Sequence, residues 1–148
     1  SISSEGWSTQ VVTGSFDWTT SDQGSSSHYA TISNFNSGNT TSEAWLISPS
    51  NDFSNSTSPT LGFRNAAKYF GDDLEVLVST NYDGTSSPST ALWQTVPPTL
   101  SSGDFEWVSS GVLNLSSFLG TTTYIAFKYT GSGSDGKTWE IDNIIINK

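Results

Sequence analysis

Hydrophobic and polar residues alternate in short runs along most of the chain, and clusters of Gly, Pro, Asn, Asp and Ser separate these runs. Leu74, Val76 and Val78 alternate with Glu75 and Ser79, which is the period of a strand with one buried face. Strands are predicted over Gly6–Val12, Tyr29–Ser33, Ala44–Ser48, Thr60–Lys68, Leu74–Ser79, Leu92–Val96, Trp107–Leu115, Thr121–Tyr129 and Thr138–Asn147. Many short strands separated by turn residues predict an all-β protein, a two-sheet antiparallel β-sandwich.

The connections between the predicted strands carry two further signals. Asp135-Gly136 lies between the last two strands, where it favours a β-hairpin. The segment from Phe16 to His28 is long and polar, and we expect it to run over the sheet surface as a loop. No linker divides the chain, so we expect residues 1–148 to form a single domain with its own core.

Composition narrows the possible partners of this domain. The chain has 5 Lys and Arg against 14 Asp and Glu, a formal charge of −9, which repels nucleic acid and favours cations. No apolar run is long enough to span a bilayer, so membrane insertion is not expected. Cysteine is absent, which excludes disulfides, thiolate metal sites and cysteine nucleophiles.

A candidate metal ligand lies in the last predicted strand. Asp142 stands among apolar neighbours, where an uncompensated buried carboxylate would be costly. Its carboxylate must therefore face water, accept hydrogen bonds or bind a cation. Calcium, which takes six to eight oxygen ligands, suits this acid-rich chain without cysteine. Glu5 and Asp17 are candidate partners in the site, although acids in such positions are more often solvated loop residues than ligands.

Two patterns raise the possibility of catalysis. Asp73 and Glu75 would point to one face of a strand, and paired carboxylates can act as acid and base in glycoside hydrolysis. Acids at the start of a strand are more often solvated turn residues. His28 lies near Asp22 and a run of serines, but no nucleophile-elbow motif accompanies it. A structural hydrogen bond is therefore the favoured role for this histidine.

Aromatic residues supply the candidate ligand contacts. Exposed rings can stack on sugars, but rings in strands are core residues by default. Tyr82 and Trp93 flank a variable turn and Tyr69 precedes an acidic loop, so these three are predicted to contact a ligand. The other landmark tryptophans are expected mostly in the core: Trp7, Trp18, Trp45, Trp107 and Trp139.

The order of several short motifs carries a family resemblance across nearly the whole chain. They are Gly6-Trp7, Phe16-Asp-Trp18, His28-Tyr-Ala-Thr-Ile32, Ala44-Trp-Leu-Ile-Ser-Pro49, Leu61-Gly-Phe-Arg64, Tyr69–Ser79, Tyr124–Tyr129 and Trp139-Glu-Ile-Asp-Asn-Ile144. In this order they resemble the MAM-like jelly rolls, in particular the choice-of-anchor J and cleaved-adhesin domains of Bacteroidetes surface and secreted proteins. Two features depart from the pattern: the paired cysteines of animal MAM domains are missing, and Ser1–Glu5 is only a stub of the usual acidic first strand.

The resemblance implies a function as well as a fold. It implies a secreted or cell-surface, non-catalytic adhesion or carbohydrate-binding module, usually one domain of a larger parent chain, with an extracellular glycan or a surface protein as partner. It also implies a structural calcium ion near the end of the last strand, with Asp142 as a typical ligand and Glu5 as a substitute for the missing acidic strand. The alternatives are a jelly-roll glycoside hydrolase or lyase and a structural spacer without a ligand.

Overall fold

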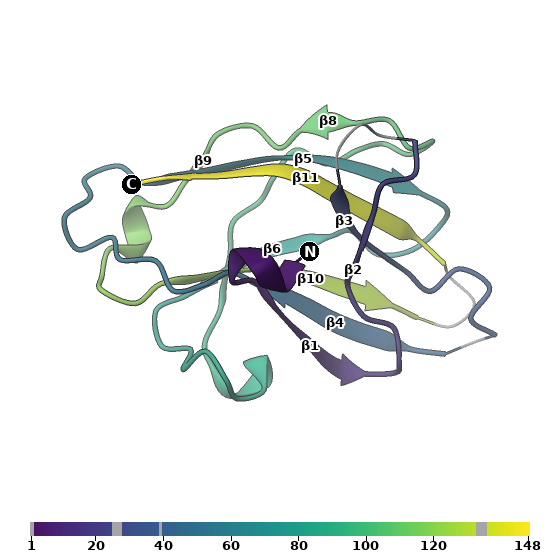
Figure 1. Cartoon of the computed structure of the whole chain (residues 1–148), viewed down its shortest axis with the longest axis horizontal. Coiled ribbons are helices and arrows are strands. Elements are labelled where there is room, and N and C mark those ends of the chain that lie inside the picture. The colour runs from purple at the N-terminus through teal and green to yellow at the C-terminus, as the bar shows by residue number, and fades with distance from the viewer. Residues whose placement is uncertain (1, 25–27, 39, 133–135) are drawn as a thin grey trace.

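Two antiparallel sheets pack face to face in the computed structural model, which describes residues 2–24, 28–38, 40–132 and 136–148 (Figure 1). Sheet A has the strand order β1 (Ser8–Thr13), β4 (Ser42–Ile47), β10 (Tyr124–Gly131), β6 (Glu75–Ser79) and β7 (Gln94–Thr95). Sheet B has the order β2 (Thr19–Ser21), β3 (Tyr29–Ser33), β11 (Thr138–Asn147), β5 (Thr60–Lys68) and β8 (Val108–Ser109), and β9 (Leu113–Asn114) also pairs with β5. The predicted two-sheet antiparallel sandwich is confirmed.

Helical structure in the described residues is confined to short 3-10 turns. They are η1 (Ile2–Glu5), η2 (Pro88–Thr90) and η3 (Ser116–Phe118). Within the described ranges, no helix has the length and apolar character needed to cross a bilayer.

The strand boundaries agree with the sequence pattern most closely where the strands are central. β3, β5 and β11 occupy the predicted ranges, whereas three peripheral predictions need correction. The Phe16–His28 loop contains the short strand β2, and only β7 forms within Leu92–Val96. The predicted strand Trp107–Leu115 is broken into β8 and β9. The predicted hairpin between the last two strands is also wrong, because β10 belongs to sheet A and β11 to sheet B and the two strands do not pair. Asp135 of its predicted turn lies outside the described residues.

The break between β8 and β9 has a local cause. The Ser110 hydroxyl accepts a hydrogen bond from the backbone N–H of Phe63 at 2.9 Å, where a strand would offer a carbonyl. Gly111 then adopts φ +79°, a left-handed conformation that a β-strand cannot continue. The side chain of Val112 consequently points into solvent, with 82% of its surface exposed.

The main core lies between the two sheets. Alternate residues of the central strands face inward and pack together, as the period of a strand requires. Leu46, Val76, Ile125, Phe127 and Tyr129 come from sheet A, and Ile32, Phe63, Trp139 and Ile141 come from sheet B.

Sheet A is covered on its outer face as well. Trp45, Ile47, Leu77 and Ala126 alternate with the inward-facing residues and form a second apolar cluster. The segment between β6 and β7, which contains η2, contributes Tyr82 to this cluster. Because both faces of the central strands are buried, β4 reads as the nearly continuous apolar run Ala44-Trp-Leu-Ile47.

A buried tyrosine joins three chain segments at one end of the sandwich. The hydroxyl of Tyr129, a side chain only 1% exposed, lies 2.6 Å from both Asn34 Oδ1 and the Lys137 carbonyl oxygen. It also accepts a hydrogen bond of 3.2 Å from the Asn34 backbone N–H. One side chain of β10 therefore fixes the β3–β4 loop and the start of β11. Burial raises the pKa of Tyr129 to about 12.

Substituting Tyr129 with Phe should destabilise the fold by roughly 1–3 kcal/mol, because it leaves buried polar groups of Asn34 and Lys137 without their partner. The substitution should also remove the part of the pH dependence of folding stability that the Tyr129 hydroxyl causes. The unfolded tyrosine ionises near pH 10 and the folded one at about 12. Stability from this group is therefore complete below about pH 10 and lost as the pH rises to about 12. Urea unfolding from pH 8 to 12 should show this additional loss only in the wild type, and parallel curves would contradict it.

Candidate functional site

A β-bulge interrupts β11 at the candidate metal ligand. β11 pairs with β3 only from Thr138 to Ile141, and its register with β5 shifts between Asp142 and Ile145. Asn143 lies inside the bulge with φ +52°, a conformation that asparagine tolerates better than most residues. Bulges redirect side chains at the points where a strand leaves its ladder. β11 therefore leaves its regular pairing at Asp142, inside the Trp139–Ile144 motif of the family resemblance.

Beside this bulge, η1 and the start of β3 enclose a hollow of about 310 Å³. Glu5 and Asp142 both line it, together with Asn143 and His28. The structure thus brings together two of the three predicted metal ligands, which are far apart in sequence. Asp142 Oδ1 also accepts a hydrogen bond of 2.8 Å from the Asn143 backbone N–H.

The oxygen groups of this hollow suit calcium in kind. Two carboxylates and the Asn143 side chain are hard ligands of the type that calcium prefers. Among the described residues, no group of three or more His, Cys, Asp and Glu side chains is arranged to hold a metal. A calcium ion here would therefore need backbone carbonyls and water to complete its shell.

The third predicted ligand lies elsewhere. Asp17 Oδ1 accepts a hydrogen bond from the Trp18 backbone N–H at 2.7 Å, and Oδ2 accepts one from the Thr9 hydroxyl at 2.9 Å. Asp17 is not among the residues lining the hollow. Its carboxylate instead joins the segment before β2 to strand β1. The structure does not bring Asp17 to Glu5 and Asp142.

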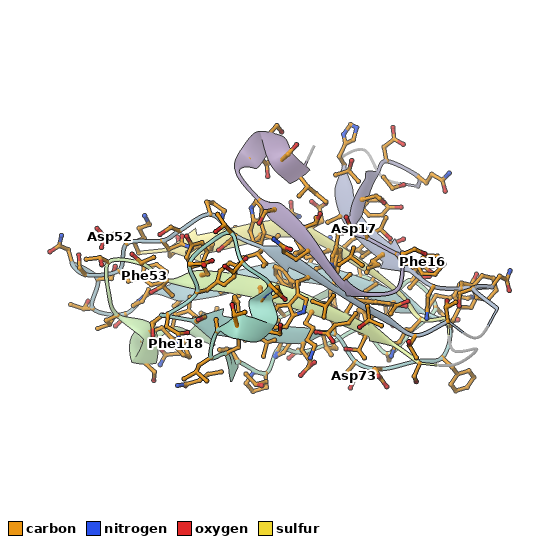
Figure 2. The ribbon with its side chains drawn as sticks, turned by 90° about the horizontal axis from the view of Figure 1, so that it is seen from below. Phe16, Asp17, Asp52, Phe53, Asp73 and Phe118 are labelled. Carbon is orange, nitrogen blue, oxygen red and sulfur yellow. The ribbon has the colours of Figure 1, made fainter. Side chains whose placement is uncertain are left out.

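The predicted acid pair is held by two different lysines. Asp73 lies 3.4 Å from Lys137 Nζ, and Glu75 lies 3.7 Å from Lys128 Nζ. Figure 2 shows Asp73 on the opposite side of the sandwich from Asp17. His28 is exposed at the hollow, and its neighbours 25–27 lie outside the described residues. Asp73 and Glu75 line neither this hollow nor the second one described below, so the predicted acid pair shares no cleft that the structure shows in the described part of the chain.

Two of the predicted ligand-contacting aromatics are packing residues. The Tyr82 side chain is 3% exposed, and its hydroxyl donates to the Ser86 carbonyl at 2.8 Å. Trp93 is half-buried, packs against Trp45 and donates its indole N–H to the Pro88 carbonyl at 2.9 Å. The expectation that these rings are free to face a ligand is wrong, because the turn that carries them folds back over the outer face of sheet A.

Tyr69 has the opposite environment. Its side chain is 43% exposed and belongs to a group of exposed rings where β5 and β10 end, at the right of Figure 1. The other members are Phe35 at 48%, Phe70 at 89% and Phe105 at 39% exposure. We call these four residues the aromatic end. Monomeric proteins seldom leave such a group of large apolar side chains in water without a functional reason.

Three of these rings pack together as a knob, not a flat platform, and Phe70 lies next to Tyr69 in the chain. Phe35 and Tyr69 stack with their centroids 3.9 Å apart and 14° between their planes. Phe105 meets Tyr69 edge-on, at 6.3 Å and 86°. Two ion pairs border the rings, Lys68 with Asp104 at 3.3 Å and Lys137 with Asp73 at 3.4 Å.

Backbone strain and close packing hold this knob in place. Tyr69 and Phe105 have positive φ angles of 70° and 55°, as do Asn36 and Asp104 beside the rings. Such conformations cost energy in residues other than glycine, and they cluster at functional sites. A Cβ at Gly136 would lie 2.5 Å from the Phe35 Cα, so only glycine permits this approach of two loops. The Gly136 backbone N–H also donates to the Phe70 carbonyl at 3.0 Å.

Sequence reasoning found only Tyr69 in this group. Phe35, Phe70 and Phe105 each lie in a segment rich in Ser, Asn, Gly and Asp, which is an unusual place for an apolar ring. That local contrast is the signal that could have identified them. Their convergence depends on the strand order and cannot be read from the chain.

Comparisons with known proteins agree with this architecture. No family model matches the sequence, and no curated protein matches it. Among solved structures, the K1 cleaved adhesin domain of Lys-gingipain from Porphyromonas gingivalis matches with a TM-score of 0.67 and 20% identity, over 95% of this chain and 89% of that one. The K2 cleaved adhesin domain of Lys-gingipain matches with a TM-score of 0.68 and 16% identity, over 98% and 91%.

A carbohydrate-binding module is also similar. The family 11 module of a cellulosomal cellulase of Clostridium thermocellum matches with a TM-score of 0.54 and 15% identity, over 93% of this chain and 85% of that one. At these identities the shared property is the fold. The chain therefore shares the jelly-roll β-sandwich fold of the cleaved adhesin domains, the fold that its motifs predicted.

Truncating Tyr82 to Ala should destabilise the fold by about 3–5 kcal/mol, the cost typical of removing a buried aromatic ring. Tyr82→Phe keeps the ring and loses only the bond to Ser86, so about 1 kcal/mol is expected. Chemical denaturation of both variants measures the difference. If Tyr82→Ala were as stable as the wild type, Tyr82 would not be a packing residue, and its predicted role as a ligand contact would stand again.

Proposed function

We propose that this chain is a non-catalytic, extracellular adhesion module that holds a surface partner through its aromatic end. The observation that carries this proposal is the convergence of Phe35, Tyr69, Phe70 and Phe105, exposed and fixed, at one end of the sandwich. A rigid scaffold that presents rings on loops loses little conformational entropy on binding. The adhesin and carbohydrate-binding domains with the same fold support a binding role over a catalytic one.

The shape of the aromatic end favours a protein as the partner of this site. A sugar ring stacks best on a broad open face, whereas Phe35 and Tyr69 cover each other's inner faces. A compact knob of rings instead resembles the aromatic anchors that fill pockets at protein interfaces. The two bordering ion pairs would form the polar rim of such an interface.

Changing Phe70 to Ser should weaken attachment by at least tenfold, since at 89% exposure this ring is the most exposed of the four. Leu92→Ser is the matched control, because Leu92 is 79% exposed but lies outside the aromatic end. Both variants should keep the wild-type melting temperature. Binding to arrays of purified extracellular proteins and glycans is the measurement. A spacer without a ligand would bind nothing on either array, and equal loss in both variants would also refute the proposed site.

We further propose that calcium binds in the hollow beside the β11 bulge and fastens η1 to the sandwich. Support comes from the carboxylates of Glu5 and Asp142, which line one hollow from opposite ends of the chain. Two carboxylates at one hollow offer oxygen ligands of the kind that calcium takes. Calcium would supply electrostatic cross-linking only. No step of binding by the aromatic end requires it.

Chelation with EDTA should lower the melting temperature, and added calcium should restore it, because a cation bound only by the folded state stabilises that state. Asp142→Asn should abolish the calcium response while retaining an acceptor for the Asn143 N–H. Asp17→Asn should leave the response intact, since Asp17 lies outside the hollow. Calorimetry with and without calcium distinguishes the variants. An EDTA-insensitive wild type would rule the ion out.

A further inference from the structure

The outer face of sheet B carries a row of polar side chains that crosses its strands. Ser21 pairs with Tyr29, Asp142 pairs with Arg64, and Arg64 pairs with Ser109. Ile141 and Phe63 face the core, so their neighbours along the strands, Asp142 and Arg64, point outward. Asp142, Arg64 and Ser109 lie on the three neighbouring strands β11, β5 and β8, which at ~4.8 Å per strand span roughly 10 Å. Unlike the outer face of sheet A, this face is not covered by an apolar cluster among the described residues.

A tryptophan lies across this face. Trp107 precedes β8, yet its ring contacts Tyr29 of β3 at 5.7 Å, although β11 and β5 lie between β3 and β8. Ala66, which points outward from β5, is fully buried, as expected if this ring covers it. The Arg64 guanidinium lies 5.9 Å from the ring centroid, and its Nη2 donates to the Trp107 carbonyl at 3.3 Å. These contacts hold the half-buried Trp107 ring over the outer face of sheet B.

A second hollow, of about 660 Å³, continues this surface past the β11 bulge. Arg64 and Ser109 line it on the side of the row, and Ile145 and Val112 give it apolar walls. It exists because Gly62 and Gly111 have no side chains to fill it. The first hollow, at Tyr29 and Asp142, lies at the other side of the same row, and Asn143 lines both.

The chemistry of this surface selects its ligand. Carboxylates of Glu140 and Asp142 accept hydrogen bonds, the Arg64 guanidinium donates them, and the Ser109 hydroxyl does both. Such a mixture around one half-buried indole ring complements the hydroxyls and apolar ring faces of a sugar. The chain's net charge of −9 disfavours glycans that carry carboxylates or sulfates.

From this arrangement we infer that the outer face of sheet B is a second binding site, which takes a neutral oligosaccharide chain lying across the strands. The chain stacks a sugar ring on Trp107, hydrogen-bonds to Arg64 and Ser109, and extends into the hollow beside Gly62. This site is separate from the aromatic end. The domain therefore binds a glycan on the outer face of sheet B and a second partner at its aromatic end.

Titration calorimetry with neutral hexasaccharides of glucose, xylose, mannose and galactose, alongside oligogalacturonate, tests this inference. At least one neutral chain should bind, with little dependence on salt, and the acidic chain should bind more weakly. Trp107→Ala should reduce the affinity at least tenfold. Gly62→Gln should also reduce it by filling the hollow, and it is compatible with folding because a Cβ there meets only Gly111 O, at 3.7 Å.

The aromatic-end variant Phe70→Ser is the control that separates this site from the proposed adhesion site. It should bind the neutral chain with wild-type affinity. If glycan binding falls in Phe70→Ser and persists in Trp107→Ala and Gly62→Gln, sugars bind at the aromatic end and the inference is wrong. Failure of all the neutral chains to bind, or preference for the acidic chain, also overturns it, while leaving the adhesion proposal to its own test.

Discussion

The buried hydroxyl of Tyr129 is the constraint on which the aromatic end depends. It lies within hydrogen-bonding distance of a side chain in the β3–β4 loop and of the backbone at the start of β11. Phe35 directly follows Asn34, and Gly136 directly precedes Lys137, so the same contacts bring together the two loops that meet at Gly136. Without this junction, the loop that carries Phe35 would not be held against the loop at Gly136 and would have to be ordered by the binding partner, at an entropic cost.

The two sheets divide the work of the domain between them. Sheet A is buried on both faces, because the segment carrying Tyr82 and Trp93 folds over it, and it therefore acts as the rigid layer. Sheet B keeps a polar outer face with Arg64, Glu140 and Asp142 among its outward side chains. The bulge of β11 makes the surface of sheet B uneven. One hollow opens beside the bulge at the sheet edge, and a second adjoins it on the face of the sheet.

Much of the fold could be predicted from the sequence, because strand periodicity is a local property. β3, β5 and β11 follow directly from alternation and turn residues. The errors have separate origins. Tyr82 and Trp93 flank a turn and were therefore predicted to face a ligand, but that turn folds back over the outer face of sheet A, a tertiary arrangement that the local sequence does not show. Trp107 was expected mostly in the core because aromatic residues in strands are core residues by default, whereas it lies half-buried across the outer face of sheet B.

The candidate sites were less predictable than the strands, for a related physical reason. Asp142 could be identified because an acid in an apolar strand violates a local rule, and its nearness to Glu5 follows only from the path of η1. Phe35, Phe70 and Phe105 also violate a local rule, being apolar rings in polar loops, and the positive φ angles beside them add a second violation. At sites of this kind a residue breaks the local sequence rule for its segment, and the fold has to hold it in place. Buried junctions such as Tyr129 do so, although they make no contact with a ligand themselves.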